Sequence, residues 1–143
     1  MHNPLSKPLR TQLENTIKAA RDVAEKAALA ALNHLGVGDA KWPEHLVDDV
    51  QKSLRRRLRE HGRSLGDAKH KGDSQDLTHL KREVAYEHWH RMLFARFLAE
   101  NNLLLWEPGA SVTLVECEEL AQDPSTNLGA KSGWELAGKL AAR

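Results

Sequence analysis

Hydrophobic residues are densest between Leu77 and Leu105, where they recur at helical spacing. Placed at 100° per residue, they fall on nearly every side of a helix rather than on one stripe. Both phenylalanines, the single tyrosine and one of the four tryptophans lie in this stretch. A helix that is apolar on most sides is usually surrounded by other elements. The pattern predicts a long central helix at about 77–102, or 76–102 at its widest, that carries the core of an all-α fold.

A second helical pattern precedes it, with Leu9, Leu13 and Ile17 followed by alanines at three- to four-residue spacing. Alanine is the best helix former, and Gly36 supplies a stop signal. This predicts a helix over 8–35, with a break into two helices as the alternative. Its alanine stripe indicates close approach to a neighbouring helix.

Between these two lies a third amphipathic segment. Pro43 is suited to a first helical turn, and Gly62 to a helix end. We therefore expect a basic amphipathic helix over 43–61 and a flexible polar loop over 63–75. Asp73, Ser74 or Asp76 would cap the central helix.

The C-terminal part holds two shorter helical patterns. Thr113 and Glu116 match a capping box and predict an acidic helix over 113–122, and Trp134 begins a last helix over 133–143. Alternating β-branched residues do not extend beyond 111–115, so no substantial sheet is expected. We expect the whole, 1–143, to be a single helical domain built as an irregular multi-helix bundle. Because it stops inside an apolar helix, we expect a fragment of a larger protein.

Composition narrows the class of protein. The 143 residues are 41% hydrophobic and 29% charged, typical of a globular domain. Cys117 is the only cysteine, which excludes an internal disulfide and favours a reducing cytoplasm. No apolar run is long enough to span a membrane, and the first ten residues lack the apolar region of a secretory signal. We expect a cytoplasmic protein with no membrane partner.

Positive charge is concentrated in one segment of the chain, residues 51–72. Residues 51–72 hold eight Lys/Arg against Glu60 and Asp67, a local net charge of +6 within a chain of net charge +1. On a helix, several of these cations fall opposite an apolar stripe made of Leu46, Val47, Val50, Leu54 and Leu58. A row of guanidinium groups can follow a phosphate backbone, with salt-dependent and sequence-independent affinity. The candidate nucleic-acid-binding residues are Lys52, Arg55, Arg56, Arg59 and Arg63.

The basic stripe also allows two alternative interpretations. In the first, the stripe is an ordinary solvated helix face, because ion pairs at i,i+4 between Asp48 and Lys52 and between Arg56 and Glu60 would weaken its positive field. It can also face an acidic protein surface, including the chain's own segment 114–123.

The sequence predicts no catalytic, cofactor-binding or metal-binding residue. His88 and His90 point to nearly opposite sides of a helix, so they do not share an ion. Glu87-x-x-His90 matches one element of a di-iron bundle, but no second Glu-x-x-His occurs. Acidic neighbours would raise the thiol pKa of Cys117 and weaken it as a nucleophile. Three aromatic residues are expected to pack in the core: Tyr86, Trp89 and Trp106.

One resemblance adds to this picture. The central segment contains Val84, Ala85, Tyr86, Trp89, Arg91, Leu93, Arg96, Phe97, Leu98 and Asn101. That spacing resembles the helical region before the catalytic domain in large adenine-specific DNA methyltransferases of the Type IIG restriction and BREX phage-defence kind. Residues 76–143 carry the resemblance most specifically.

The resemblance implies a non-catalytic N-terminal helical accessory domain of a restriction–modification enzyme. It would brace the C-terminal catalytic domain of the same polypeptide and contact the DNA backbone. S-adenosylmethionine is implied for the parent enzyme, but the family's glycine motif and Asn-Pro-Pro-aromatic motif have no match here. The alternative is a helical protein-interaction or dimerisation module, such as a homodimer, with no nucleic-acid role.

Overall fold

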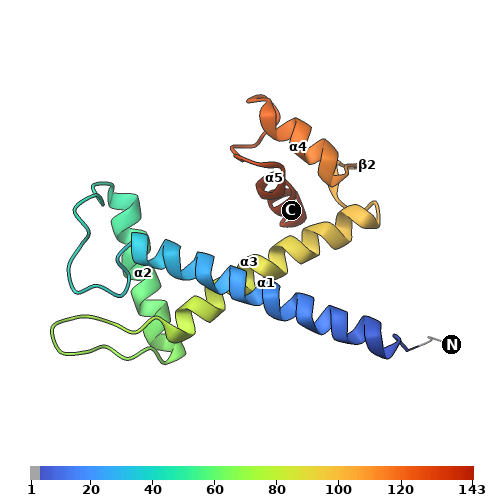
Figure 1. Cartoon of the computed structure of the whole chain (residues 1–143). Coiled ribbons are helices and arrows are strands. Elements are labelled where there is room, and N and C mark those ends of the chain that lie inside the picture. Colours follow the sequence, from blue (N-terminus) through green and yellow to red (C-terminus); the bar gives the residue numbers. More distant parts are fainter. Residues whose placement is uncertain (1–3) are drawn as a thin grey trace. The chain divides into compact units, whose positions relative to one another are not determined.

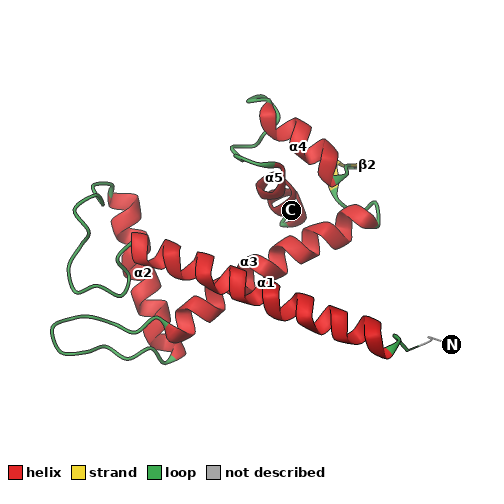
Figure 2. Cartoon of the chain, viewed as in Figure 1, coloured by secondary structure: helices red, strands yellow, loops and turns green. Residues whose placement is uncertain are grey.

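The computed structural model describes residues 4–143, and helices dominate them (Figures 1 and 2). The elements in chain order are α1 (Lys7–His34), α2 (Asp49–Leu65), α3 (Thr78–Glu100), β1 (Leu105–Glu107), β2 (Ala110–Ser111), α4 (Leu114–Gln122) and α5 (Gly133–Ala141). The two short strands form one antiparallel hairpin. The predicted all-α class without a substantial sheet is confirmed.

The chain divides into two compact units, one ending at Tyr86 and one comprising Glu87–Arg143. The boundary falls inside α3, which supplies buried residues to a core in each unit: Leu80 to the first, and Ala95 and Ala99 to the second. A long central helix was predicted, and its bounds agree within two residues. That 1–143 acts as one domain stays a prediction.

α1 is one uninterrupted helix of 28 residues, so the alternative of two helices is wrong. Pro8 sits in its first turn, where a missing N–H costs nothing. Gly36 follows its end with φ of +60°, and a Cβ there would clash with the ring of Pro43. Only glycine fits this left-handed position against the proline ring.

α2 differs from its predicted span of 43–61. Pro43 lies in a turn, and the helix begins where the Asp48 carboxylate accepts a hydrogen bond from the Val50 N–H at 2.9 Å. It ends at Leu65, and Gly66, with φ of +108°, forms its C-terminal cap. Gly62, the predicted end, is a buried residue inside the helix. A Cβ at Gly62 would lie 2.8 Å from Nε2 of Gln75, so close packing explains this glycine.

A residue in the loop after α2 caps the N-terminus of α3. The buried Asp67 carboxylate accepts hydrogen bonds from the backbone N–H groups of His79 and Leu80, at 2.8 and 2.9 Å. The predicted caps at 73, 74 and 76 (Asp73, Ser74 and Asp76) were wrong, because a residue eleven positions before the helix does the capping. Residues 63–65 belong to α2, and a bridge between Lys69 and Gln75 closes the loop that follows.

The core of the first unit joins α1, α2 and α3. Leu32, Val37 and Leu80 are buried, and partly buried residues surround them: Leu35, Leu58, Leu65, Leu77 and Val84. α1 contributes to this core through its C-terminal half.

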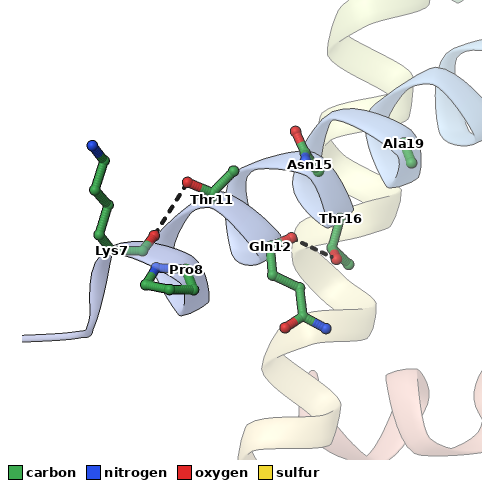
Figure 3. A pocket seen from close by; sticks show the side chains of 7 residues that line it. All are labelled: Lys7, Pro8, Thr11, Gln12, Asn15, Thr16 and Ala19. Atoms are coloured by element: carbon green, nitrogen blue, oxygen red, sulfur yellow. Dashed lines mark hydrogen bonds between the residues drawn. The ribbon is translucent and has the colours of Figure 1, made fainter.

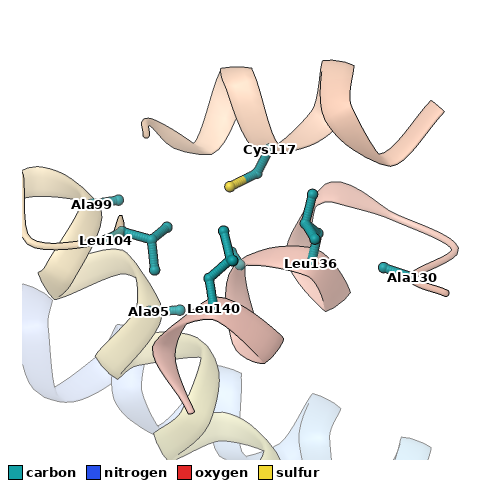
Figure 4. Packing of buried hydrophobic residues seen from close by; sticks show 8 residues of the cluster. Ala95, Ala99, Leu104, Cys117, Ala130, Leu136 and Leu140 are labelled. Carbon is teal, nitrogen blue, oxygen red and sulfur yellow. The ribbon is translucent and has the colours of Figure 1, made fainter. Parts of the chain in front are cut away.

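The second unit has a larger core, drawn in Figure 4. Leu104, Cys117, Leu136 and Leu140 pack there with small residues of α3. Its helices have side-chain caps at their N-termini. The predicted capping box is present: the Glu116 N–H donates to Oγ1 of Thr113 at 3.2 Å, and the Thr113 N–H donates to the Glu116 carboxylate at 2.7 Å. Ser132 caps α5, which ends at Ala141 rather than at the last residue.

Candidate interaction surfaces

Two of the five predicted phosphate-binding residues are buried. Arg55 is 5% exposed and Arg59 6%, and both lie on the face of α2 that packs inward. Three of the five apolar residues expected on that face are exposed instead: Val47, Val50 and Leu54. The predicted orientation of this helix was therefore wrong for Arg59, which was expected opposite the apolar stripe, and for most of that stripe, whereas Arg55 was expected to flank its apolar side.

The reason lies in the loop between α1 and α2, whose backbone carbonyl groups converge on these two guanidinium groups. Arg55 donates to the carbonyl oxygens of Gly36, at 2.9 Å, and Asp39, at 2.6 Å. Arg59 donates to those of Val37, at 2.8 Å, and Asp39, at 2.7 Å. Buried carbonyl groups need partners, and each arginine supplies several donors in a rigid fork.

Further contacts hold the same pair. The Arg55 guanidinium lies 4.8 Å from the ring centroid of Trp42, and Arg59 donates to the carbonyl oxygen of Asp73. Burial, and then the neighbouring Arg59 charge, lower the pKa of Arg55 from its ordinary value. A hydrogen bond from Lys69 lowers the pKa of the Asp73 carboxyl, with a smaller contribution from Arg59. Arg55 and Arg59 clamp loops to α2 and are not available to a phosphate.

The other arginines of α2 face solvent, and Lys52 does so in part. Arg56, Arg57 and Arg63 are exposed and Lys52 is half-buried. Lys52 lies 3.7 Å from the Asp49 carboxylate, and Arg63 reaches the Gln75 amide oxygen at 3.4 Å. Neither predicted pair, Asp48–Lys52 or Arg56–Glu60, is among the ion pairs of residues 4–143. A smaller cationic face than predicted remains, and it includes Arg57.

A second surface lies on α3, on the side away from the core of the second unit. Leu93 is 51% exposed, Phe94 45% and Phe97 56%. Ala95 and Ala99 of the same turns are buried in the core drawn in Figure 4. One side of the helix that was expected to be surrounded is therefore uncovered.

The aromatic residues predicted for the core fall into two groups. Trp89 and Trp106 are half-buried. Tyr86 is 59% exposed, so the core placement predicted for it was wrong.

A third surface follows α1. Leu5, Leu9, Leu13 and Ile17 are each 43–49% exposed. Leu9, Leu13 and Ile17 run along one side of the helix at the spacing that the sequence displays, and Leu5 lies just before its first residue. This apolar row lies on the N-terminal half of α1, away from the residues that α1 gives to the core.

The hollow in Figure 3 lies along another side of α1 and is lined by residues of this helix alone. Its two threonine hydroxyls are already used, since Thr11 donates to the Lys7 carbonyl and Thr16 to the Gln12 carbonyl. It offers no second wall, and neither of its threonine hydroxyls is a free donor.

Within residues 4–143, no group of three or more His, Cys, Asp or Glu side chains is placed to hold a metal ion. Cys117 is buried, and its thiol pKa is raised by burial and then by the Glu116 charge. No helix among these residues is both long and apolar enough to cross a membrane.

The chain matches no protein-family model, no curated protein and no solved structure.

Proposed function

We propose that this chain is a non-catalytic helical docking module that braces the catalytic part of an adenine-specific DNA methyltransferase of the restriction–modification kind. The observation that carries the docking role is the exposed apolar face of α3, formed by Leu93, Phe94 and Phe97. Contiguous exposed apolar residues, aromatic ones above all, are typical of protein–protein interfaces.

The methyltransferase as partner rests on the sequence resemblance. Leu93 and Phe97 belong both to the family-like spacing and to the exposed face. Ala85 and Leu98 of the same spacing are buried or half-buried and serve the fold. One helix thus supplies residues that hold the module together and residues left over for a partner.

Site-specific photo-crosslinking in the native cells tests this role. A photoreactive amino acid in place of Leu93 is expected to cross-link to a domain that carries an Asn-Pro-Pro-aromatic motif, whether that domain lies in the same polypeptide or in a separate one. The same amino acid in place of His88, which lies on another side of α3, is the matched control. Capture of only proteins without that motif, or equal capture from both positions, contradicts the proposal.

Contact with DNA phosphates is a second part of the proposal, carried by the exposed side chains of Arg56, Arg57 and Arg63. Removing one phosphate-binding cation should lower the slope of log affinity against log salt by about 0.9. We expect weak, sequence-independent binding of duplex DNA at low salt.

The variant Arg56→Glu with Arg63→Glu should weaken that binding about tenfold or more and reduce the salt slope by about 2. The pair Lys131→Glu with Arg143→Glu makes the same change in net charge elsewhere and should leave the slope nearly unchanged. Equal weakening in both double variants would mean that only net charge matters. No binding at low salt removes DNA contact and leaves the docking role to stand alone.

A further inference from the structure

The first half of α1 is exposed along its whole length. Every residue from Lys7 to Ala19 faces solvent, although Leu9, Leu13 and Ile17 lie on one side of the helix. Helices in water obtain most of their stability from the packing of an apolar face rather than from propensity. An unsupported helix with three large apolar residues in line is a surface that another helix would cover.

The same side of α1 continues in its second half with small residues. Ala20 and Ala24 are half-buried, and Ala27 and Ala31 are exposed. The core contacts of α1 come from a neighbouring side, where Ala28 and Leu32 lie. From residue 9 to residue 31 this face is about 33 Å long at 1.5 Å per residue.

The two halves of this face fit each other when one copy is reversed. In an antiparallel pair centred near Lys18, Leu9 and Leu13 of one copy lie against the alanines of the other, and the two Ile17 side chains meet at the centre. Bulky residues then fill the space that small residues leave, as close helix packing requires. A parallel pair would place leucine against leucine and alanine against alanine, leaving one half crowded and the other loose.

The charges beside this face are complementary in the same orientation. One flank of the face carries four charged residues: Arg10, Glu14, Arg21 and Glu25. Reversal brings Arg10 opposite Glu25 and Glu14 opposite Arg21, and both pairs share one centre close to Lys18. In a parallel pair this flank would lie against the other flank of the partner helix, so these four charged residues would not meet one another.

The side chains of this flank differ in whether they already form ion pairs within their own chain. The Arg21 side chain is 72% exposed, although it pairs with Glu25 of its own chain. Glu25 also lies 3.4 Å from Arg21 and 3.6 Å from Lys81 of its own chain. The pair between Glu14 and Arg21 is therefore the one that should respond most to substitution.

We propose that two copies of this chain associate through an antiparallel pair of α1 helices. The interface consists of Leu9, Leu13 and Ile17 of each copy against the small residues of the other, Ala20, Ala24, Ala27 and Ala31. It uses none of the α3 residues assigned to docking, so it stands or falls independently of the proposed function.

Sedimentation velocity of the whole chain over a range of concentrations tests the association. The wild type should form a dimer, and Leu13→Glu should raise the dimer dissociation constant at least tenfold with unchanged helix content by circular dichroism. Thr11→Glu, on the far side of α1, is the matched control and should dimerise like the wild type. A wild type that stays monomeric at all concentrations, or equal weakening in both variants, overturns the proposal.

The orientation has its own test. Glu14→Arg and Arg21→Glu should each weaken the dimer, and the double variant should regain most of the affinity because the pair is restored with reversed signs. Ile17→Cys, at the centre, should cross-link two copies under mild oxidation, whereas Leu9→Cys should not. Absence of recovery together with cross-linking of Leu9→Cys would establish a parallel pair and overturn the proposed interface.

Discussion

The arginines of α2 divide into two kinds according to what their guanidinium groups contact. Arg55 and Arg59 are buried and bind backbone carbonyl groups of two loops, while Arg56 and Arg57 face solvent. Helical periodicity had assigned Arg59 to the solvent side. Arg55 and Arg59 thus support the fold, whereas the adjacent Arg56 and Arg57 form part of the surface.

A matched pair of substitutions measures this division. Arg59→Ala should lower the free energy of unfolding by about 3 kcal/mol, because several buried carbonyl groups lose a charged donor. Arg56→Ala should change it by less than about 0.5 kcal/mol, as is usual for exposed positions. Urea denaturation followed by circular dichroism gives both values. Equal effects would mean that the Arg59 clamp does not support the fold.

At the scale of the element, α3 depends on a carboxylate that is distant in sequence. Asp67 accepts two hydrogen bonds from the first turn of α3, and Gly62 leaves room beside it, since a Cβ there would lie 3.3 Å from the Asp67 carboxylate. Asp73, Ser74 and Asp76, which are nearer in sequence, do not take this role. A cap that comes from eleven residues away couples the end of α2 to the start of α3.

Removing that cap should destabilise the chain. Asp67→Ala is expected to lower the free energy of unfolding by about 2 kcal/mol, the upper end for a missing N-cap, because two backbone N–H groups lose their acceptor. Asp76→Ala removes an exposed carboxylate that pairs with His70 and should cost less than about 0.5 kcal/mol. Thermal or urea unfolding distinguishes them, and a larger cost for Asp76→Ala would refute the assignment.

α4 has a pH-dependent N-terminus. Hydrogen bonds from the backbone N–H and then the hydroxyl of Thr113 lower the pKa of the Glu116 carboxyl from its ordinary value of 4.5. Because the folded-state pKa is the lower one, this contribution to stability is present above pH 4.5 and disappears as the pH falls through the folded value. The stability difference between wild type and Glu116→Gln should therefore be larger at about pH 7 than at about pH 3. A difference that does not depend on pH would contradict the capping box.

At the scale of the whole molecule, each unit has its own core, and α3 supplies residues to both. The side of α3 bearing Leu93, Phe94 and Phe97 belongs to neither core. Apolar surface that a stable fold does not need is the physical ground for assigning a partner to it.

That assignment predicts different costs on the two sides of α3. Phe97→Asn should leave the free energy of unfolding within about 0.5 kcal/mol, because its ring already meets water. Ala95→Asn should cost about 2–4 kcal/mol, because it places an amide in a closed core. Denaturant titration of both variants measures this. A large cost for Phe97→Asn would place that face inside the fold and remove the docking surface.

The sequence by itself determined the helical class, the approximate spans of α1 and α3 and the capping box of α4. These features rest on local spacing and on hydrogen bonds between residues three or four positions apart, which a single sequence displays directly. Thr113 and Glu116 needed no other part of the chain to be recognised.

Only the tertiary structure decided which side of each helix is buried. On α2, the demand of loop carbonyl groups for donors outweighed the burial of Val50 and Leu54 and turned two arginines inward. On α3, periodicity indicated apolar residues on most sides, but the described chain supplies too few elements to cover them all. Hydrogen-bond satisfaction and the number of available partners are properties of the folded whole. The first divided a predicted row of five cations on α2 into a loop clamp and a smaller cationic face, and the second left apolar surfaces on α1 and α3 uncovered.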